Sequence, residues 1–147
     1  MTERAKEALQ GFASGRNCAQ AVLCAYSDVV GLTKEQAAMV ASGFGGGMGR
    51  LRQNCGAYSA AVMLCGALEG ADGGTKAKRP AVYARVQQVN AAFIRRMGTV
   101  NCGELLGRLA EQPTPEERTP AYYASRPCAG IIRKTCEMLD DMMARQE

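Results

Sequence analysis

Apolar side chains recur every three or four residues along this chain, and this periodicity restricts the fold more than any other feature of the sequence. The longest such segment is 79–97, whose apolar side chains are Val82, Val86, Val89, Phe93 and Met97. This spacing puts side chains on one face of an α-helix, whereas a half-buried strand alternates with a period of two. No segment of the sequence shows that alternation. The pattern predicts an all-α fold, a compact bundle of about six or seven helices.

Capping and helix-breaking residues divide the chain into these helices. We expect helices over 2–14, 17–30, 33–44, 79–97 and 101–110, another from Asn54 to a glycine-rich turn at 70–76, and a last one that begins at Pro127. Glycines at 45–49 and prolines at 111–120 predict loops. The last helix is expected to bury Ile131, Ile132, Cys136, Leu139, Met142 and Met143. With 147 residues and no internal linker, residues 1–147 are expected to form a single domain.

The composition is that of a globular protein, and one residue type is missing from it. Hydrophobic residues make up 47% of the chain and charged residues 22%. The chain has no histidine, so the usual general base and every imidazole metal ligand are excluded. Any chemistry must come from sulfur, carboxylate or backbone groups. The seven cysteines are therefore the first candidates.

The sequence also predicts the location of the protein and the classes of partner that it binds. Its first residues are charged and do not resemble a signal peptide, and no apolar run approaches the roughly 20 residues of a membrane span. We expect a soluble, cytoplasmic protein, whose odd number of thiols argues against a static disulfide framework. A modest net charge of +4 and 5% aromatic residues predict no nucleic-acid partner and no membrane partner. The expected partner is a redox protein of unknown identity, and the oligomeric state, a homo-oligomer included, is left open.

Three of the four asparagines directly precede a cysteine. Asparagine is a preferred N-cap, because its side-chain oxygen accepts an unpaired N–H group of the first helical turn. Each Asn-Cys pair therefore predicts a cysteine at the first position of a helix. Proline favours the first turn, so Pro127 predicts a fourth such cysteine. The four residues are Cys18, Cys55, Cys102 and Cys128.

Four thiols at helix N-termini share one electrostatic environment. A helix N-terminus carries roughly half a positive charge and free N–H donors, and both favour the thiolate, which is the nucleophile and the metal ligand. We expect the four sulfurs to meet in one site, as catalytic thiols or as metal ligands. Cys24, Cys65 and Cys136 lie further along their helices, in apolar surroundings, and are expected to pack in the core.

The glycine-rich loop is a second candidate element of the site. Its glycines could let backbone N–H groups approach sulfur or an anion closely, although the sequence lacks the phosphate-binding Gly-x-x-x-x-Gly-Lys pattern. We expect the loop to line the cysteine site, with Gly45, Gly46, Gly47 and Arg50 as cofactor-binding residues and with Arg50 and Arg52 offsetting thiolate charge. A flexible turn between helices is the alternative.

An ordered set of short motifs spans nearly the whole chain. In order, these are NCAQAVL (17–23), FGGGMGR (44–50), CGA (55–57), CGELL (102–106) and Cys128. The set resembles the C_GCAxxG_C_C family of redox-active proteins, which have four characteristic cysteines and a CGAxxG motif. The resemblance matches Cys18, Cys55, Cys102 and Cys128 to the family cysteines one by one, while Ala60 replaces the closing glycine. Some members have twin-arginine leaders, which imply a prosthetic group such as an iron–sulfur cluster. The first residues of this sequence do not resemble such a leader.

Three functions remain open from the sequence. The favoured one is a four-thiolate site that binds an iron–sulfur cluster or another thiophilic metal for electron transfer. The second is thiol–disulfide chemistry, in which cysteine pairs cycle without a metal. The third is a non-enzymatic helical interaction module. Spacings of 37, 47 and 26 residues between the four cysteines contain no Cys-x-x-Cys motif, so they name neither the cofactor nor the pairing, and enzymatic activity as an oxidoreductase is left open.

Overall fold

The computed structural model describes residues 1–107, 117–120 and 127–145. Helices are the regular elements of these residues, which contain no β-strand, and the predicted all-α fold is confirmed. One isolated antiparallel bridge pairs Asn54 with Asn101. Within the described ranges, no helix combines the length and the apolar character that crossing a membrane requires.

The N-terminal half contains short helices, of which α1, α2 and α4 begin at side-chain caps. They are α1 (Glu3–Ala13), α2 (Cys18–Ala25), α3 (Ser27–Val30), α4 (Lys34–Ala41), the 3-10 helix η1 (Ser42–Phe44) and α5 (Gly45–Met48). Asn17 and Thr33 each form a capping box with a glutamine three residues later. The expected helix over 17–30 is therefore two helices that meet at Tyr26, and the one over 33–44 ends in a 3-10 turn.

The C-terminal half contains the longer helices. They are α6 (Gly56–Glu69), α7 (Arg79–Met97), α8 (Cys102–Leu106) and α10 (Cys128–Ala144). Helix α7 has the predicted bounds and ends at Gly98. Helix α8 is shorter than the expected 101–110, because Gly107 has a left-handed backbone (φ 68°) that caps it. Residues 108–110 and most of the expected loop at 111–120 lie outside the described residues.

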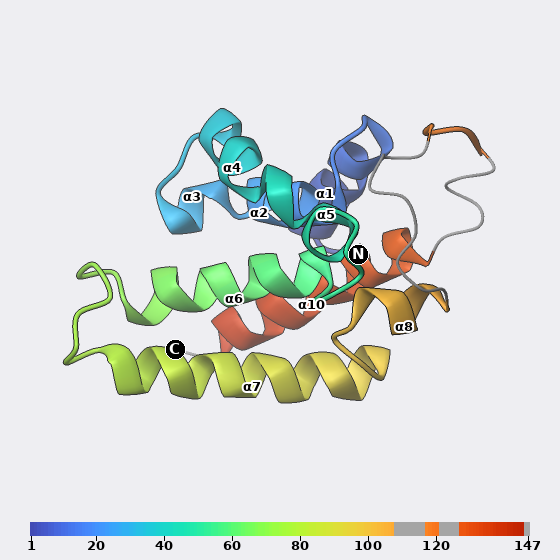
Figure 1. Ribbon diagram of the computed structural model, residues 1–147. Coiled ribbons are helices and arrows are strands. Elements are labelled where there is room, and N and C mark those ends of the chain that lie inside the picture. Colours follow the sequence, from blue (N-terminus) through green and yellow to red (C-terminus); the bar gives the residue numbers. More distant parts are fainter. Residues whose placement is uncertain (108–116, 121–126, 146–147) are drawn as a thin grey trace.

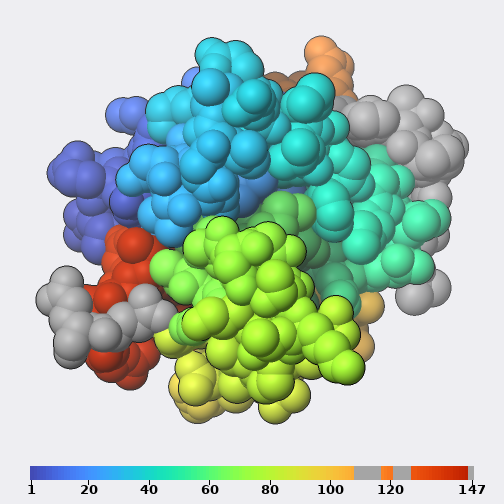
Figure 2. All heavy atoms as spheres, turned by 90° about the vertical axis from the view of Figure 1, so that its left-hand side faces the viewer, coloured from blue at the N-terminus to red at the C-terminus, as the bar shows by residue number. Residues whose placement is uncertain are grey.

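Helix α2 lies at the centre of the molecule. It packs against α1, α4, α6 and α10, and six of its eight residues are buried. Helices α6 and α7 run side by side, with α10 packed against both (Figure 1). The N-terminal ends of α6 and α10 lie near α5 and α8 at one end of the molecule. At the opposite end, the turn between α6 and α7 lies below α3 and α4 (Figure 2).

Small side chains allow α2 and α6 to approach closely where both helices begin. A Cβ atom added at Gly56 would lie 2.9 Å from the backbone nitrogen of Ala19, which is too short for real Cβ contacts. Ala57, Ala60 and Ala61 continue this small-residue surface and are fully buried. Because Ala60 is accommodated in the core, its replacement of the family's glycine leaves the start of α6 intact.

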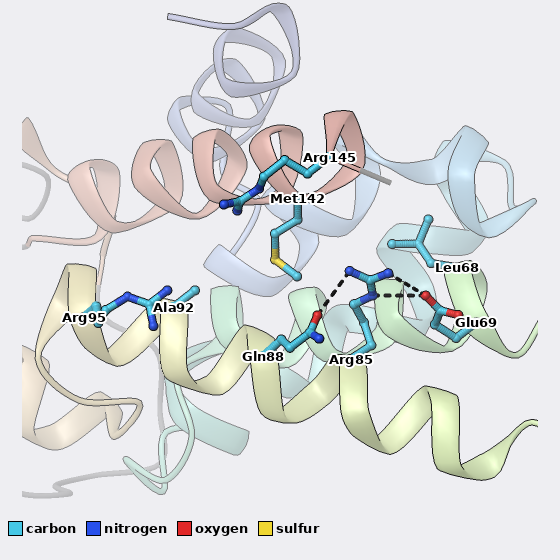
Figure 3. A pocket seen from close by; sticks show the side chains of 8 residues that line it. All are labelled: Leu68, Glu69, Arg85, Gln88, Ala92, Arg95, Met142 and Arg145. Carbon is cyan, nitrogen blue, oxygen red and sulfur yellow. Dashed lines mark hydrogen bonds and ion pairs between the residues drawn. The ribbon is translucent and has the colours of Figure 1, made fainter. Parts of the chain in front are cut away.

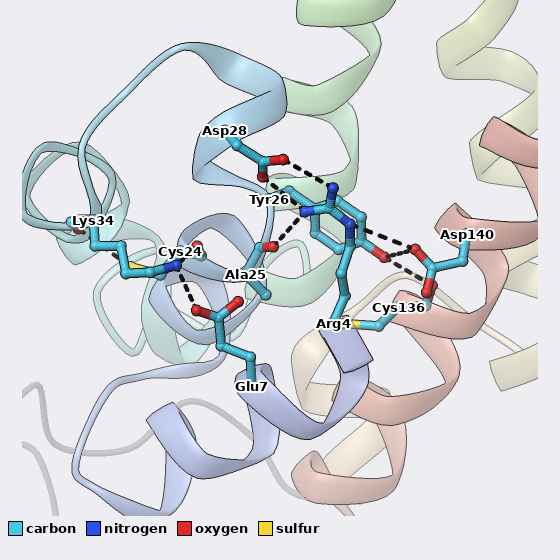
Figure 4. A network of polar contacts seen from close by, with 9 residues as sticks. All are labelled: Arg4, Glu7, Cys24, Ala25, Tyr26, Asp28, Lys34, Cys136 and Asp140. Carbon is cyan, nitrogen blue, oxygen red and sulfur yellow. Dashed lines mark hydrogen bonds and ion pairs between the residues drawn. The ribbon is translucent and has the colours of Figure 1, made fainter. Parts of the chain in front are cut away.

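A polar network fixes α1 and α10 to the end of α2 (Figure 4). The hydroxyl of buried Tyr26 lies 2.9 Å from the Cys136 carbonyl oxygen and 2.7 Å from a carboxylate oxygen of Asp140. Arg4 stacks over the Tyr26 ring and donates to the Ala25 carbonyl at 2.8 Å. A buried hydroxyl needs such partners, because an unsatisfied one costs about 1–3 kcal/mol. The network therefore defines how these helices dock.

Candidate redox site

The four predicted cysteines line one small pocket at the end of the molecule where α6 and α10 begin. Its wall consists of Cys18, Cys55, Cys102 and Cys128 together with Leu105, Leu106 and Ile131. Residues that are far apart in the sequence are thus brought together, as the helix-start argument predicted. The cavity has a volume of about 20 Å³, which is room for about one water molecule.

Three of the four cysteines occupy the predicted helical position. Cys18, Cys102 and Cys128 are the first residues of α2, α8 and α10. The side-chain oxygen of Asn17 accepts from the Gln20 N–H group at 2.9 Å, and that of Asn101 accepts from the Glu104 N–H group at 2.8 Å. These two asparagines are the N-caps that the Asn-Cys pairs predicted.

The same prediction is wrong for Asn54 and Cys55. Helix α6 begins at Gly56, so Cys55 is itself the N-cap residue and Asn54 lies outside the helix. The reason is a backbone pairing between segments that are distant in sequence. The Cys55 N–H group donates to the Val100 carbonyl at 2.7 Å, which keeps residues 54 and 55 extended.

This pairing also aligns Cys55 with Cys102. The Cys102 N–H group donates to the Gln53 carbonyl at 2.6 Å, so the two Asn-Cys segments run antiparallel. Each cysteine follows its bridged asparagine by one residue. The bridge therefore holds the two cysteine segments side by side, and both cysteines line the pocket.

Cys18 and Cys55 form a hydrogen-bonded pair of sulfurs with opposite pKa shifts. The Cys55 thiol donates to the Cys18 sulfur, and the backbone N–H groups of Gly46, Ala19 and Gly56 add to this effect, so the pKa of Cys18 falls to about 6 although burial opposes the fall. The pKa of Cys55 rises well above its usual value, because its proton is held by Cys18 and because it is buried. The two opposite shifts mean that Cys18 ionises before Cys55.

The donors around Cys18 come from three different segments. Ala19 belongs to the first turn of α2, Gly56 begins α6, and Gly46 lies in α5. The thiolate thus faces the N-termini of two helices, where partial positive charge favours an anion. A Cβ atom at Gly56 would lie only 2.8 Å from the Cys18 sulfur, so glycine is required for this approach.

The glycine loop lies beside the cysteines, as expected. Gly46 (φ 66°) and Gly47 (φ 69°) have left-handed backbones, so α5 is a tight turn rather than a regular helix. A Cβ atom at Gly47 would lie 2.5 Å from the Cys102 Cβ atom. Gly45 packs in the same way against the side chain of Asn17. The turn therefore contacts Asn17, Cys18 and Cys102 through atoms that only glycine leaves accessible.

The two candidate arginines take different places. Arg50 is half-buried, and its side chain lies over Gly46 without lining the pocket. Arg52 is 7% exposed, and its Nη1 atom donates to the Cys102 sulfur at 3.6 Å. The Arg52 Nε atom is the one buried side-chain nitrogen or oxygen without a hydrogen-bond partner among the described residues. A buried cation needs negative charge nearby, and the Cys102 sulfur supplies a group that can carry it.

The sequence prediction omitted some residues of the site. Gly56 was quoted only as part of a motif, although its lack of a side chain permits the contact with Cys18. Leu105, Leu106 and Ile131 supply the apolar wall. Ile131 follows Cys128 by three residues, and this helical spacing is a local signal that the two side chains share a face.

The remaining three cysteines belong to the core, as predicted. Cys24, Cys65 and Cys136 are between 0% and 1% exposed. Burial raises the pKa of Cys65 to about 11 and that of Cys136 to about 12, so both stay protonated at neutral pH. No disulfide joins any of the seven cysteines, all of which lie in the described part of the chain.

The four sulfurs are suitable donors for a thiophilic metal, but they are not close enough together to hold one. Four sulfurs are the ligands that zinc, copper(I) or iron–sulfur clusters prefer. However, in the described ranges no three Cys, Asp or Glu side chains are grouped closely enough to hold a metal ion. The donor chemistry fits a thiophilic metal, but the observed geometry does not.

A wider cavity of about 680 Å³ lies away from the cysteines (Figure 3). It lies between α7, α10 and the last residues of α6. Leu68 is 13 residues along from Cys55, which corresponds to about 20 Å of helix. Arg85 in this cavity donates to Glu69 at 2.6 Å and to Gln88 at 3.3 Å. The cavity contains no cysteine and is separate from the redox site.

Comparison with known proteins identifies one family. Residues 16–142 match the C_GCAxxG_C_C family, whose description is "Putative redox-active protein (C_GCAxxG_C_C)". The match covers nearly the whole chain and includes all four pocket cysteines. No curated protein and no solved structure gives a significant match.

Proposed function

The chain belongs to the C_GCAxxG_C_C family of redox-active proteins, and from this premise we propose that it is a thiol–disulfide redox protein whose reacting pair is Cys18 and Cys55. One observation carries the proposal: the Cys18 sulfur lies against the Cys55 thiol and three backbone N–H groups, and all of these contacts lower the pKa of Cys18. A thiolate next to a resolving thiol is the arrangement that disulfide exchange requires.

The first step is attack by the Cys18 thiolate on one sulfur of a substrate disulfide. This forms a mixed disulfide with Cys18 and releases the other substrate sulfur as a thiolate. The loss of charge on Cys18 removes a cause that raises the pKa of Cys55, so Cys55 can then give up its proton. Cys55 attacks the Cys18 sulfur, and its proton passes to the departing thiolate. Two electrons have moved to the substrate, and the chain holds a Cys18–Cys55 disulfide.

The proposed partner is a protein or small molecule that carries a disulfide, and a dithiol reductant of the cytoplasm would regenerate the pair. Cys18 is the entry point because it is half-buried, whereas Cys55 is 5% exposed. The pocket is small, and apart from the four sulfurs its wall is apolar. A substrate disulfide must therefore be exposed enough for its sulfur to reach Cys18, and a disulfide surrounded by bulky groups is disfavoured.

The proposal can be tested by trapping the mixed disulfide. The C55S variant lacks the resolving thiol, so treatment with oxidised glutathione should leave glutathione attached to Cys18. The C18S variant should not accumulate the adduct, and the wild type should instead lose a pair of titratable thiols reversibly. C65S is a matched control, since Cys65 is buried in the core and donates to Ala61 at 3.4 Å, a bond that serine can retain. If C55S carries no adduct on Cys18, the proposed pair is wrong.

A single thiophilic ion is the second candidate, because all four family cysteines line the same pocket. Such an ion would be held by Cys18, Cys55, Cys102 and Cys128, and it would supply electron transfer or structural cross-linking. The sulfurs would have to move closer together to bind it. Metal analysis and a visible absorbance spectrum after anaerobic purification test this candidate. A stoichiometric metal that the C102S and C128S variants both lose would favour it over the disulfide cycle.

A further inference from the structure

We propose that Cys102 takes over the disulfide from Cys18 and Cys55, and that Arg52 positions and activates it for this transfer. The proposal rests on the proposed function, because it requires a Cys18–Cys55 disulfide to start from. It extends that function by giving the third pocket cysteine a role and by assigning the buried arginine to the same step.

The backbone brings the receiving sulfur to the correct partner. The Asn54–Asn101 bridge joins the segments that carry Cys55 and Cys102 through hydrogen bonds of 2.7 Å and 2.6 Å, and both cysteines line the same pocket. Gly47 lies against the Cys102 Cβ atom, where any side chain would clash, and so fixes Cys102 in the pocket. Disulfides form between side chains whose Cβ atoms lie about 3.5–4.5 Å apart, so the transfer requires Cys55 and Cys102 to close on each other across the pocket that both line.

Arg52 provides the charge that Cys102 needs as a nucleophile. Its guanidinium group is buried, and its Nη1 atom donates to the Cys102 sulfur at 3.6 Å. No carboxylate forms an ion pair with Arg52 within the described residues, and its Nε atom has no partner there. Burial without a carboxylate is costly for a cation unless another anion is present. The Cys102 sulfur is the group at this contact that can carry negative charge.

The environment of Cys18 decides which sulfur is attacked. When Cys102 attacks the Cys55 sulfur, the Cys18–Cys55 bond breaks, a Cys55–Cys102 bond forms, and Cys18 leaves as a thiolate. Three backbone N–H groups already stabilise that thiolate, and a more stable thiolate leaves faster. Attack on Cys18 would instead expel Cys55, which burial disfavours as an anion. The exchange conserves charge and electrons, and it restores the Cys18 nucleophile.

The test is a time course of disulfide mapping. The reduced protein receives a single equivalent of oxidised glutathione, is quenched with acid, and is alkylated and digested for mass spectrometry. In the wild type we expect the Cys18–Cys55 disulfide first and the Cys55–Cys102 disulfide later. The C102S variant should stop at Cys18–Cys55, and the C18S variant should join Cys55 to Cys102 directly.

The role of Arg52 is tested in the same assay. Arg52 has a left-handed backbone (φ 59°), which asparagine tolerates, so R52N removes the charge with little backbone strain. The transfer should slow several-fold near pH 7, because Cys102 loses the adjacent positive charge that favours its thiolate. R52K should retain most of the rate. R50N is the matched control, because Arg50 shares the left-handed backbone (φ 68°) and does not line the pocket.

The outcomes separate this proposal from the proposed function. A C102S protein that forms Cys18–Cys55, together with a wild type that never passes the disulfide on, would overturn the transfer alone. If Cys55 of the C18S variant forms a disulfide with a cysteine other than Cys102, the transfer proposal is likewise overturned. Equal transfer rates in wild type and R52N would remove Arg52 from the step. Absence of Cys18–Cys55 in C102S would overturn both proposals together.

Discussion

Replacement of Gly56 by alanine tests the packing on which the Cys18 thiolate depends. Gly56 is the first residue of α6, and its backbone does not need the left-handed region, so alanine is acceptable for the local conformation. The added Cβ atom would lie 2.8 Å from the Cys18 sulfur and 2.9 Å from the Ala19 backbone nitrogen. The new methyl group can be accommodated only if the start of α2 moves away, because the contacts at Ala19 are to backbone.

The expected magnitude follows from two opposing effects. Overpacking in a well-packed interior typically costs about 1–3 kcal/mol. Alanine is favoured over glycine in a helix by at most about 1 kcal/mol. The G66A variant is the matched control, because Gly66 lies in the same helix and has no atom within 4 Å of its added Cβ. G66A should be as stable as the wild type or more so, and G56A should be less stable than G66A by about 1–3 kcal/mol.

The chemical consequence is measured separately from the stability. A displaced Cys18 sulfur loses N–H donors, so its pKa moves up from about 6 toward its usual range. Alkylation of Cys18 by iodoacetamide near pH 7 should therefore slow several-fold in G56A, with about thirtyfold as the limit for a free thiol. Urea unfolding gives the free energy, and peptide mass spectrometry gives the alkylation rate of each cysteine. If G56A matches G66A in both measurements, the close contact between α6 and Cys18 does not exist as described.

Three further predictions follow from individual contacts. Stability should rise between about pH 6 and the ordinary thiol pKa of about 8.5, because the folded chain ionises Cys18 before the unfolded chain does. At higher pH it should fall, because Cys55, Cys65 and Cys136 keep their protons when folded. Urea titrations should show a smaller rise in C18S, and no histidine contributes in this range. N101A should lose about 1 kcal/mol of stability with its N-cap, whereas N54A, which removes no cap, should lose less than about 0.5 kcal/mol in the same denaturation assay. Y26F should cost about 1–3 kcal/mol, measured by thermal unfolding, because two acceptors on α10 lose the buried hydroxyl.

The fold class and most helix positions could be predicted because they depend on local information. The spacing of apolar residues in 79–97 is a property of the segment itself, and α7 spans Arg79–Met97 in the structure. Asn17 and Asn101 cap their helices through hydrogen bonds to residues three positions away. Helix starts of this kind need no knowledge of the rest of the chain.

The error at Asn54 has a non-local cause. Its dipeptide is the same as the two that cap helices, so no neighbouring residue distinguishes it. The Val100 carbonyl accepts the Cys55 N–H group and holds the segment extended, so α6 starts one residue later than expected. The choice between Arg50 and Arg52 has a similar origin. Both have left-handed backbones, and only the folding of the turn decides that Arg52 reaches the Cys102 sulfur.

The pairing of the cysteines is undetermined in the sequence for the same reason. Four sulfurs beside helix N-termini have nearly the same local electrostatics, so local arguments make them equivalent. The structure distinguishes Cys18 because donors from other segments, Gly46 and Gly56, converge on it in addition to its own helix. Cys55 differs because its thiol donates to the Cys18 sulfur and is buried, and both effects raise its pKa. Reactivity within this site is therefore set by tertiary contacts to glycine backbone, and substitutions at these glycines should change the chemistry while all four cysteines remain in place.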